Sequence, residues 1–287
     1  MKMIIPYGKQ VITSADKEAV MEVLDSDFLT QGPMVPRLES ELSAISNVSY
    51  ATVINSATSA LHLSCLALGV SVGDEVWTVP NTFVASANCA LYCGAKINFV
   101  DIDPETSNIS VHLLNQKLKA AEKLGQLPKV LIPVHLSGEP CDMAEIKKLG
   151  DQYGFRIIED ASHAIGGKYH GEPIGSCEYS DITVFSFHPV KIVTSGEGGA
   201  ALTNCPHLDE RLKLLRSHGI TRDKKLMEFP SDDGLYYEQI DLGFNYRMTD
   251  IHAALGLSQL PRLNEYVAKR HEIASIYDKQ FDQSNVH

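Results

Sequence analysis

The chain has 287 residues, and its 25 Lys and Arg against 36 Asp and Glu leave a formal net charge of -11. Its hydrophobic share of 44% and charged share of 21% are those of an ordinary globular protein. Such an acidic surface repels nucleic acid and anionic membranes, so we expect neither as a partner. An anionic small substrate would need a locally basic or amide-lined pocket.

The sequence carries no targeting or membrane signal that we recognise. The N-terminal residues MKMIIPYGKQ contain no sustained apolar run and no small-residue cleavage site. No apolar stretch approaches the roughly 20 residues needed to span a bilayer. The six cysteines form no C-x-x-C pair, which favours reduced thiols in a cytoplasmic protein.

Helix-like and strand-like patterns alternate from residue 15 onward. Apolar residues three to four apart predict helices, and short runs rich in β-branched residues predict strands. The predicted elements are, in chain order, helices at residues 15–26 and 37–46, a strand at 50–55, a helix at 58–69, a strand at 75–79, a helix at 83–94, a strand at 97–103, a helix at 112–125, and strands at 129–136, 155–160, 181–187 and 198–204. This alternation predicts an α/β fold whose mostly parallel sheet carries helices on both faces.

The last part of the chain has a different pattern. A long helical pattern runs from Thr249 to Phe281, with a break signal at Pro261, and a polar stretch follows to His287. We therefore predict a large domain over residues 1–247, including an N-terminal arm, and the start of an incomplete, smaller C-terminal domain over residues 248–287.

The chemically distinctive residues lie at the predicted strand ends, where open α/β sheets bind their ligands. Asp160 ends an apolar strand, and a carboxylate there is costly to bury without a positive partner. It is either a helix N-cap or the partner of the pyridinium nitrogen of pyridoxal phosphate (PLP). Lys191 precedes a Gly-rich turn. A desolvated lysine there suits Schiff-base chemistry, and a solvated surface lysine is the simpler alternative.

Other strand ends suggest what surrounds these two residues. Ala57 and Thr58 begin a helix directly after a strand, which predicts either an anion site or an ordinary Ser/Thr cap. Phe83 either stacks on a planar cofactor or packs in the core. The histidines show no metal-ligand spacing, so we predict no metal site. Neither a phosphate-binding Gly-rich fingerprint nor a G-x-S-x-G elbow occurs.

Taken in order, five segments resemble the sugar aminotransferases of the DegT/DnrJ/EryC1/StrS family. They are NSATSALHLS, PNTFVASAN, EDASHAIG, FSFHPVKIVTSGEGG and FNYRMTDIHAALGLSQL. The resemblance runs from IPYGKQ to about residue 280 and implies a fold-type I PLP-dependent transferase like aspartate aminotransferase, with its small C-terminal domain truncated. A related dehydratase branch has histidine in place of the Schiff-base lysine, so Lys191 favours amination.

The resemblance also implies a role for each matching residue. Lys191 would bind PLP as a Schiff base and move the proton, Asp160 would hold the pyridine nitrogen, and His163 would lie near the phenolic oxygen. Phe83 would stack on the ring. The PLP phosphate would be bound by Ala57, Thr58 and Ser186, together with Asn245 of a neighbouring subunit. The substrate contacts would be Tyr7, Asp27, Phe28, Leu29 and Thr30, with Ala57, Ser186 and Asn245.

The reaction follows from the same resemblance, whose wording is closest to the pseudaminic-acid branch of the family. L-glutamate would donate its amino group to C4 of a UDP-linked 4-keto-6-deoxy-N-acetylhexosamine, in a cytoplasmic homodimer. Two alternatives stay open: an aminotransferase for another nucleotide keto-sugar, such as a dTDP-linked one, and a non-catalytic PLP-binding protein.

Overall fold

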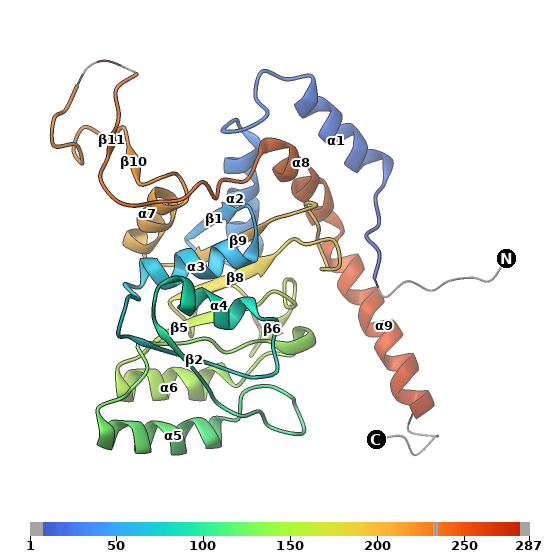
Figure 1. Cartoon of the computed structure of the whole chain (residues 1–287). Coiled ribbons are helices and arrows are strands. Elements are labelled where there is room, and N and C mark those ends of the chain that lie inside the picture. Colours follow the sequence, from blue (N-terminus) through green and yellow to red (C-terminus); the bar gives the residue numbers. More distant parts are fainter. Residues whose placement is uncertain (1–7, 232, 234, 282–287) are drawn as a thin grey trace.

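A seven-stranded sheet lies at the centre of the computed structural model, which describes residues 8–231, 233 and 235–281 (Figure 1). The strand order is β1-β9-β8-β5-β4-β2-β3. The strands are β1 (Tyr50–Ile54), β2 (Glu75–Thr78), β3 (Lys96–Phe99), β4 (Val130–Leu131), β5 (Arg156–Asp160), β8 (Ile182–Ser186) and β9 (Gly199–Thr203). β9 is antiparallel to both β1 and β8, and the other pairings are parallel. The carboxyl ends of β1, β2, β5 and β8 therefore point toward one edge, where β9 begins.

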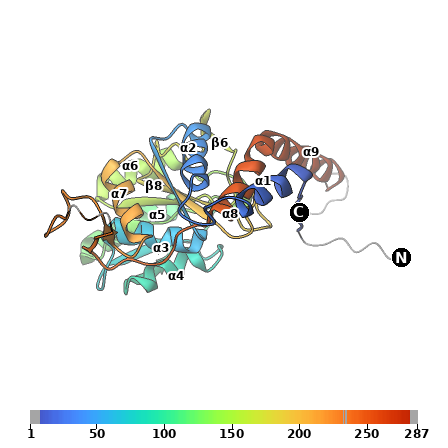
Figure 2. The same ribbon diagram turned by 90° about the horizontal axis from the view of Figure 1, so that it is seen from above.

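Helices cover both faces of this sheet (Figures 1 and 2). One face packs against α3 (Ala57–Ala67), α4 (Ala85–Tyr92) and α7 (Pro206–Leu215). The other packs against α2 (Met34–Ser46), α5 (Val111–Leu124), α6 (Met143–Tyr153) and α8 (Asp250–Gln259). Successive strand residues point to opposite faces, so Ile157 packs with α5 and α6 and Ile158 with α3 and α4. Burial of each such apolar side chain, relative to leaving it exposed, contributes about 1.5–3 kcal/mol to the free energy of folding.

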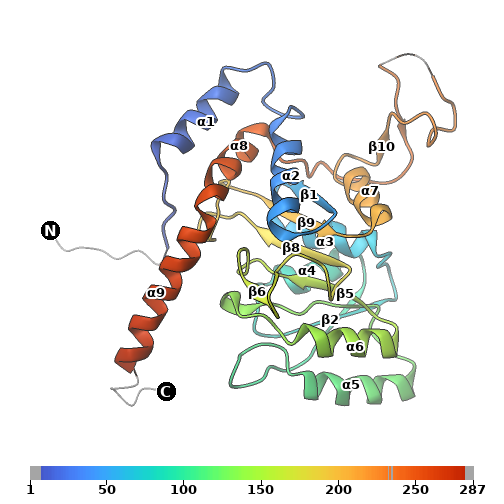
Figure 3. The same ribbon diagram turned by 180° about the vertical axis from the view of Figure 1, so that it is seen from behind.

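A buried ion pair holds helix α1, and with it the N-terminal arm that precedes it, against the C-terminal helices. Asp16 lies in α1 (Ser14–Leu24) and is fully buried, and Nη2 of Arg262 donates to both of its carboxylate oxygens, Oδ1 at 2.6 Å and Oδ2 at 2.8 Å. Burial opposes its ionisation, but Arg262 and Thr13 hold the pKa of Asp16 at about 2. Arg262 belongs to a 3-10 turn, η2 (Leu260–Arg262), that joins α8 to α9 (Leu263–Phe281). The arm therefore runs beside α9 (Figure 3).

The predicted α/β class is confirmed, and the predicted break at Pro261 coincides with η2. The helices α6 and α7 were not predicted, although Asp142 caps α6 and Pro206 begins α7. Short elements complete the fold: η1 (Leu136–Gly138), β6 (Lys168–Tyr169), β7 (Glu172–Pro173), β10 (Ile220–Thr221) and β11 (Glu238–Gln239). The boundary at residue 247 stays a prediction, while Met248 and Ala253 pack in the same core as α2.

Candidate active site

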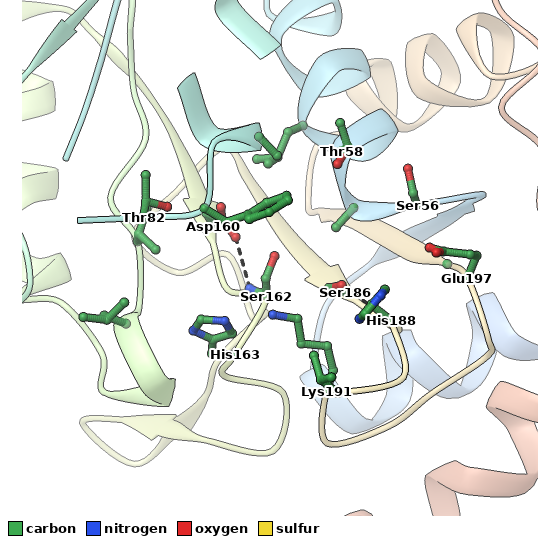
Figure 4. A pocket seen from close by; sticks show the side chains of 18 residues that line it. Ser56, Thr58, Thr82, Asp160, Ser162, His163, Ser186, His188, Lys191 and Glu197 are labelled. Atoms are coloured by element: carbon green, nitrogen blue, oxygen red, sulfur yellow. Dashed lines mark hydrogen bonds between the residues drawn. The ribbon is translucent and has the colours of Figure 1, made fainter. Parts of the chain in front are cut away.

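A cavity of about 460 Å³ lies at the edge of the sheet where these strands end (Figure 4). Its size suits a small cofactor together with the reacting part of a substrate. Seven of the predicted cofactor residues line this cavity: Ala57, Thr58, Phe83, Asp160, His163, Ser186 and Lys191. The strand-end rule thus brings together residues from β1–α3, β5 and β8, which are far apart in the sequence.

Asp160 is a buried carboxylate held by uncharged donors. Its side chain is 5% exposed, and Oδ2 accepts a 2.6 Å hydrogen bond from Ser86 Oγ. Its Oδ1 accepts from the backbone N–H of Ser162 at 3.2 Å, drawn as a dashed line in Figure 4. No described side chain forms an ion pair with this carboxylate. Because a buried anion is costly without a cation, Asp160 is arranged for a positively charged ligand group.

Lys191 projects its amine into the same cavity, toward Ser162 and Asp160 (Figure 4). Burial lowers the pKa of the amine, and the negative charge of Asp160 opposes this effect. The chain on either side is fixed, since Lys191 N–H donates to His188 O at 2.9 Å and Ser195 N–H donates to Phe187 O at 2.9 Å. A larger neutral fraction makes the amine a better nucleophile toward a carbonyl carbon.

The N-terminus of α3 forms the opposite wall of the cavity. Ser56 caps the helix through its side chain, and the first intrahelical bond runs from Ala60 N–H to Ser56 O. The N–H groups of Ala57 and Thr58 precede that bond, so they and the helix dipole favour an anion. Gly199 packs against this turn so closely that a Cβ would lie 2.4 Å from Ala57 N. The glycine therefore allows β9 to meet the helix end.

His163 and Phe83 complete the enclosure. Nδ1 of His163 accepts from the Ser137 N–H at 3.2 Å, which leaves the ring proton on Nε2 when the imidazole is neutral. Burial and then Lys191 lower the pKa of His163, against the effect of Asp160, so the neutral ring is favoured. Phe83 is 72% exposed and lines the cavity instead of the core. Its ring is free to lie against a planar ligand.

The other predicted residues that the structure describes do not line this cavity. Asn245 is exposed and pairs through its backbone with Ser217. The substrate segment Asp27, Phe28, Leu29 and Thr30 lies elsewhere, held where Thr30 pairs with Thr249. Thr249 lines a smaller adjoining cavity of about 360 Å³ that shares Ser56 and Glu197 with the first. Tyr7 is outside the described residues.

Several polar residues of the site were not predicted as parts of it. Ser86 lies within α4 and reaches Asp160, and Thr82 Oγ1 is 2.8 Å from the same Ser86 Oγ. Ser162 and Glu197 also line the cavity. Ser86 could have been suspected because it is a polar residue on the buried face of an otherwise apolar helix.

Three groups that line the cavity fit a phosphorylated pyridine aldehyde such as PLP. The α3 terminus suits a phosphate, Asp160 suits a protonated ring nitrogen, and Lys191 suits an aldehyde carbon. A non-polar residue at position 160, or a cationic side chain already paired with Asp160, would have argued against this fit. The fold and the site therefore fit a PLP-dependent enzyme of the α/β class.

Comparison with known proteins identifies the family. The DegT/DnrJ/EryC1/StrS aminotransferase family matches residues 10–287, and the chain belongs to it. The UDP-4-amino-4,6-dideoxy-N-acetyl-beta-L-altrosamine transaminase of Campylobacter jejuni is 41% identical over 283 residues, 98% of this chain and 71% of that protein. The GDP-perosamine synthase of Escherichia coli O157:H7 is 37% identical over 279 residues, 97% of this chain and 71% of that protein.

Solved structures of sugar aminotransferases share the fold of this chain. Helicobacter pylori PseC, an aminotransferase involved in the biosynthesis of pseudoaminic acid, has a TM-score of 0.87 at 34% identity, covering 97% of this chain and 71% of PseC. The PLP form of the sugar aminotransferase Spr1654 from Streptococcus pneumoniae has a TM-score of 0.85 at 31% identity, covering 98% of this chain and 72% of Spr1654. The predicted family, the aminotransferase activity and PLP as cofactor are confirmed. None of the described helices has the length and apolar character to cross a membrane.

Proposed function

We propose that this enzyme transfers the amino group of L-glutamate to C4 of a UDP-linked 4-keto-6-deoxy-N-acetylhexosamine, a step of pseudaminic acid biosynthesis. The observation that carries the proposal is the shared cavity of Lys191 and Asp160 beside the α3 N-terminus. The choice of sugar is supported by the relatives named as altrosamine transaminases, at 41% and 39% identity, and by the likeness to PseC.

In this proposal Lys191 would hold the cofactor through its side-chain amine, and the same amine would move the proton at sugar C4. When bound, PLP supplies an electron-withdrawing ring that stabilises negative charge at the reacting carbon. Asp160 would keep the ring nitrogen protonated, and Ser86 and Ser162 hold the carboxylate in position. The lowered pKa of Lys191, caused by burial, keeps part of the amine neutral and able to accept the proton.

The other cavity residues hold the cofactor. Phe83 would contact one face of the ring, and His163, whose pKa is lowered by burial and by Lys191, would lie near the phenolic oxygen. The phosphate would be bound by the N–H of Ala57 and the hydroxyls of Thr58 and Ser186, which all line the cavity. Helix N-termini with free N–H groups are common phosphate sites, which supports this assignment.

We assign the enzyme to a homodimer in which Asn245 serves the neighbouring site. Asn245 is exposed and lies outside the cavity of its own chain, which is consistent with a role across an interface. Tyr7 and the segment of Asp27, Phe28, Leu29 and Thr30 are assigned to the nucleotide-sugar. Phe28 and Leu29 are 53% and 49% exposed, so their side chains are accessible to a ligand or a partner.

The proposal is tested with purified, PLP-loaded enzyme. We expect glutamate to convert the bound cofactor, seen as a loss of its visible absorption, and a UDP-linked 4-keto-6-deoxy-N-acetylhexosamine to restore it. Mass analysis should find an aminated sugar nucleotide. GDP- and dTDP-linked keto-sugars are assayed in parallel, because a relative of 37% identity is a GDP-perosamine synthase. Preference for one of those series would refute the UDP assignment, and absence of any glutamate reaction would refute the catalytic one.

A further inference from the structure

Two hydroxyl groups lead from the wall of the cofactor cavity to the carboxylate of Asp160. The first belongs to Thr82, which lies in the bend between β2 and α4, lines the cavity and is partly exposed. Its Oγ1 lies 2.8 Å from Oγ of Ser86, which in turn lies 2.6 Å from Oδ2 of Asp160. In Figure 4 the hydroxyl of Thr82 is on the side that faces Asp160. We call these three side chains the Asp160 network.

The charge of Asp160 decides the direction of both hydrogen bonds in this network. With Asp160 ionised, as its role toward a protonated ring requires, the carboxylate can only accept a hydrogen bond. The single proton of the Ser86 hydroxyl therefore points to Oδ2 of Asp160. Ser86 then offers only lone pairs to Thr82, so the Thr82 hydroxyl is the donor in the 2.8 Å bond. Thr82 donates to Ser86, and Ser86 donates to Asp160.

Ser86 has a second acceptor within reach, which competes with Asp160 for its proton. The backbone carbonyl oxygen of Phe83 lies 3.3 Å from Ser86 Oγ. A serine in a helix commonly donates to a carbonyl of the preceding turn, and one proton cannot serve both acceptors fully. The bond from Thr82 occupies a lone pair of Ser86 Oγ and polarises its O–H group. Because a polarised O–H binds an anion more strongly, Thr82 favours the bond to Asp160.

Burial makes the orientation of the Asp160 carboxylate depend on these protein donors. Ser86 is 0% exposed and Asp160 is 5% exposed, so bulk water does not compete for either group. Oδ1 of Asp160 accepts from the N–H of Ser162 at 3.2 Å, a longer bond than the 2.6 Å bond from Ser86. Of these two bonds the one from Ser86 is therefore the stronger constraint on the carboxylate.

We infer that Thr82 is a positioning residue for the amino transfer and acts on Asp160 through Ser86. By keeping the Ser86 proton on Oδ2, Thr82 holds the carboxylate in the orientation that receives the protonated ring nitrogen of PLP. Its effect on the cofactor is therefore exerted at that nitrogen alone. The inference rests on the role proposed for Asp160, and it holds whichever keto-sugar is the acceptor.

The experiment compares Thr82→Val, which keeps the branched shape of the side chain but removes the donor, with Thr82→Ser, which keeps the hydroxyl. Ser86→Ala and the double variant Thr82→Val/Ser86→Ala complete the set. Thr106→Val, in an exposed turn, is the matched control. Thr82 is partly exposed, so we expect its variants to fold.

Two quantities are measured for each variant. The first is the rate of the glutamate half-reaction of the PLP-loaded enzyme, followed by loss of the cofactor's visible absorption. The second is the affinity of the cofactor-free full chain for PLP and for the PLP analogue in which a C–H group replaces the ring nitrogen. The analogue keeps the phosphate and the aldehyde, so it reports every contact except the one with Asp160.

We expect Thr82→Val to slow the glutamate half-reaction about fivefold, as for the loss of one ordinary hydrogen bond, and to weaken PLP binding by a similar factor. Affinity for the analogue should change less than about twofold, because the analogue has no ring N–H for Asp160 to receive. Thr82→Ser should recover most of the rate, but not all, since serine lacks the branching that restricts the threonine side chain. The double variant should be no slower than Ser86→Ala alone.

Two results would overturn the inference. If the losses of Thr82→Val and Ser86→Ala multiply in the double variant, Thr82 acts by a route other than Ser86. If Thr82→Val weakens PLP and the analogue equally, it distorts the cavity as a whole. Asp160→Asn separates this inference from the proposed function. When Asp160→Asn slows the half-reaction and Thr82→Val does not, only the role of Thr82 fails; when neither slows it, the role of Asp160 fails as well.

Discussion

Ser86 Oγ donates a 2.6 Å hydrogen bond to Oδ2 of Asp160, and so links helix α4 to the carboxyl end of β5. The bond orients a carboxylate that no described side chain neutralises. We therefore expect Asp160 to contact the cofactor directly, and Ser86 to affect the cofactor only through its hydrogen bond to Asp160.

Substitution should separate these two contributions. Asp160→Asn removes the negative charge that we propose keeps the ring nitrogen of PLP protonated, so we expect the glutamate half-reaction to slow at least a hundredfold. Ser86→Ala leaves the charge and the Ser162 N–H bond in place, and we expect about a tenfold loss, the value of one charge-assisted hydrogen bond. Stopped-flow absorbance measures both rates, and Asp151→Asn on the exposed surface of α6 is the control. Equal effects of the two variants would contradict this division of roles.

Lys191 should be indispensable in a way that charge alone does not explain. Lys191→Arg keeps a cation in the cavity but no neutral amine, because arginine stays protonated. We expect both Lys191→Arg and Lys191→Ala to lower turnover about a thousandfold or more, through loss of covalent attachment and proton transfer. Borohydride reduction followed by peptide mass analysis should find cofactor mass on Lys191 in the wild type. Attachment to another lysine, or near-normal turnover of either variant, would disprove the assignment.

The sequence could predict the site where its residues directly follow apolar strands. Asp160, Ser186 and the α3 terminus could be placed because parallel strands bring their carboxyl ends to one edge. Ser86 could not, because its contact with Asp160 depends on how α4 is rotated against the sheet. Nor could the position of the N-terminal residues against the C-terminal helices, because it depends on the contacts of Val11 and Asp16 with Gln259 and Arg262, which are distant in the sequence. Local patterns predict elements, but the rotation and packing of helices depend on tertiary contacts.

A buried pair on the other face of β5 should make stability depend on pH. His135 Nε2 lies 2.8 Å from Glu159 Oε2, and both side chains are buried. Nδ1 of His135 accepts from the backbone N–H of Cys141 at 3.2 Å, so Nε2 carries the ring proton toward Glu159. Burial disfavours the imidazolium, but Cys141 and Glu159 raise the pKa of His135. Because the folded-state pKa lies above the unfolded value, the stabilisation is fully present below about pH 6.5 and is lost as pH rises toward 10.

Calorimetric melting from pH 6 to 10 tests this. We expect the wild-type Tm to fall with pH, at up to about 1.4 kcal/mol of unfolding free energy per pH unit for one proton. Glu159→Gln should cost about 3–5 kcal/mol at pH 6 and show a flatter dependence, because the buried cation loses its partner. Glu145→Gln, on the exposed side of α6, should follow the wild type. Parallel curves for the wild type and Glu159→Gln would refute the role of the pair.

Cys93 should be the most reactive thiol of the folded enzyme near neutral pH. It caps α4, is partly exposed, and lies beside Cys65 and His62. The hydrogen bond with Cys65 lowers the pKa of Cys93, and burial opposes this effect. His62 also lowers it, and the resulting pKa of Cys93 is about 6. We expect iodoacetamide labelling of Cys93 to be half-maximal near pH 6 in the native state. Cys65→Ala should raise that midpoint. A native midpoint as high as that of the unfolded chain would contradict the prediction.

A mixture of two inactive variants should test whether Asn245 serves the partner's site. In a two-fold dimer of Lys191→Ala with Asn245→Ala, one site is built from an intact lysine and the partner's intact Asn245, and the other is doubly defective. Random mixing after co-refolding or co-expression should therefore restore about a quarter of wild-type activity. Lys191→Ala mixed with Asp160→Asn is the matched control, because both residues line the cavity of one chain and every hybrid site stays defective. No restoration in the first mixture, despite hybrid dimers confirmed by native mass spectrometry, would show that Asn245 acts within its own chain. Restoration in the control would show instead that Lys191 and Asp160 do not serve the same site of one chain.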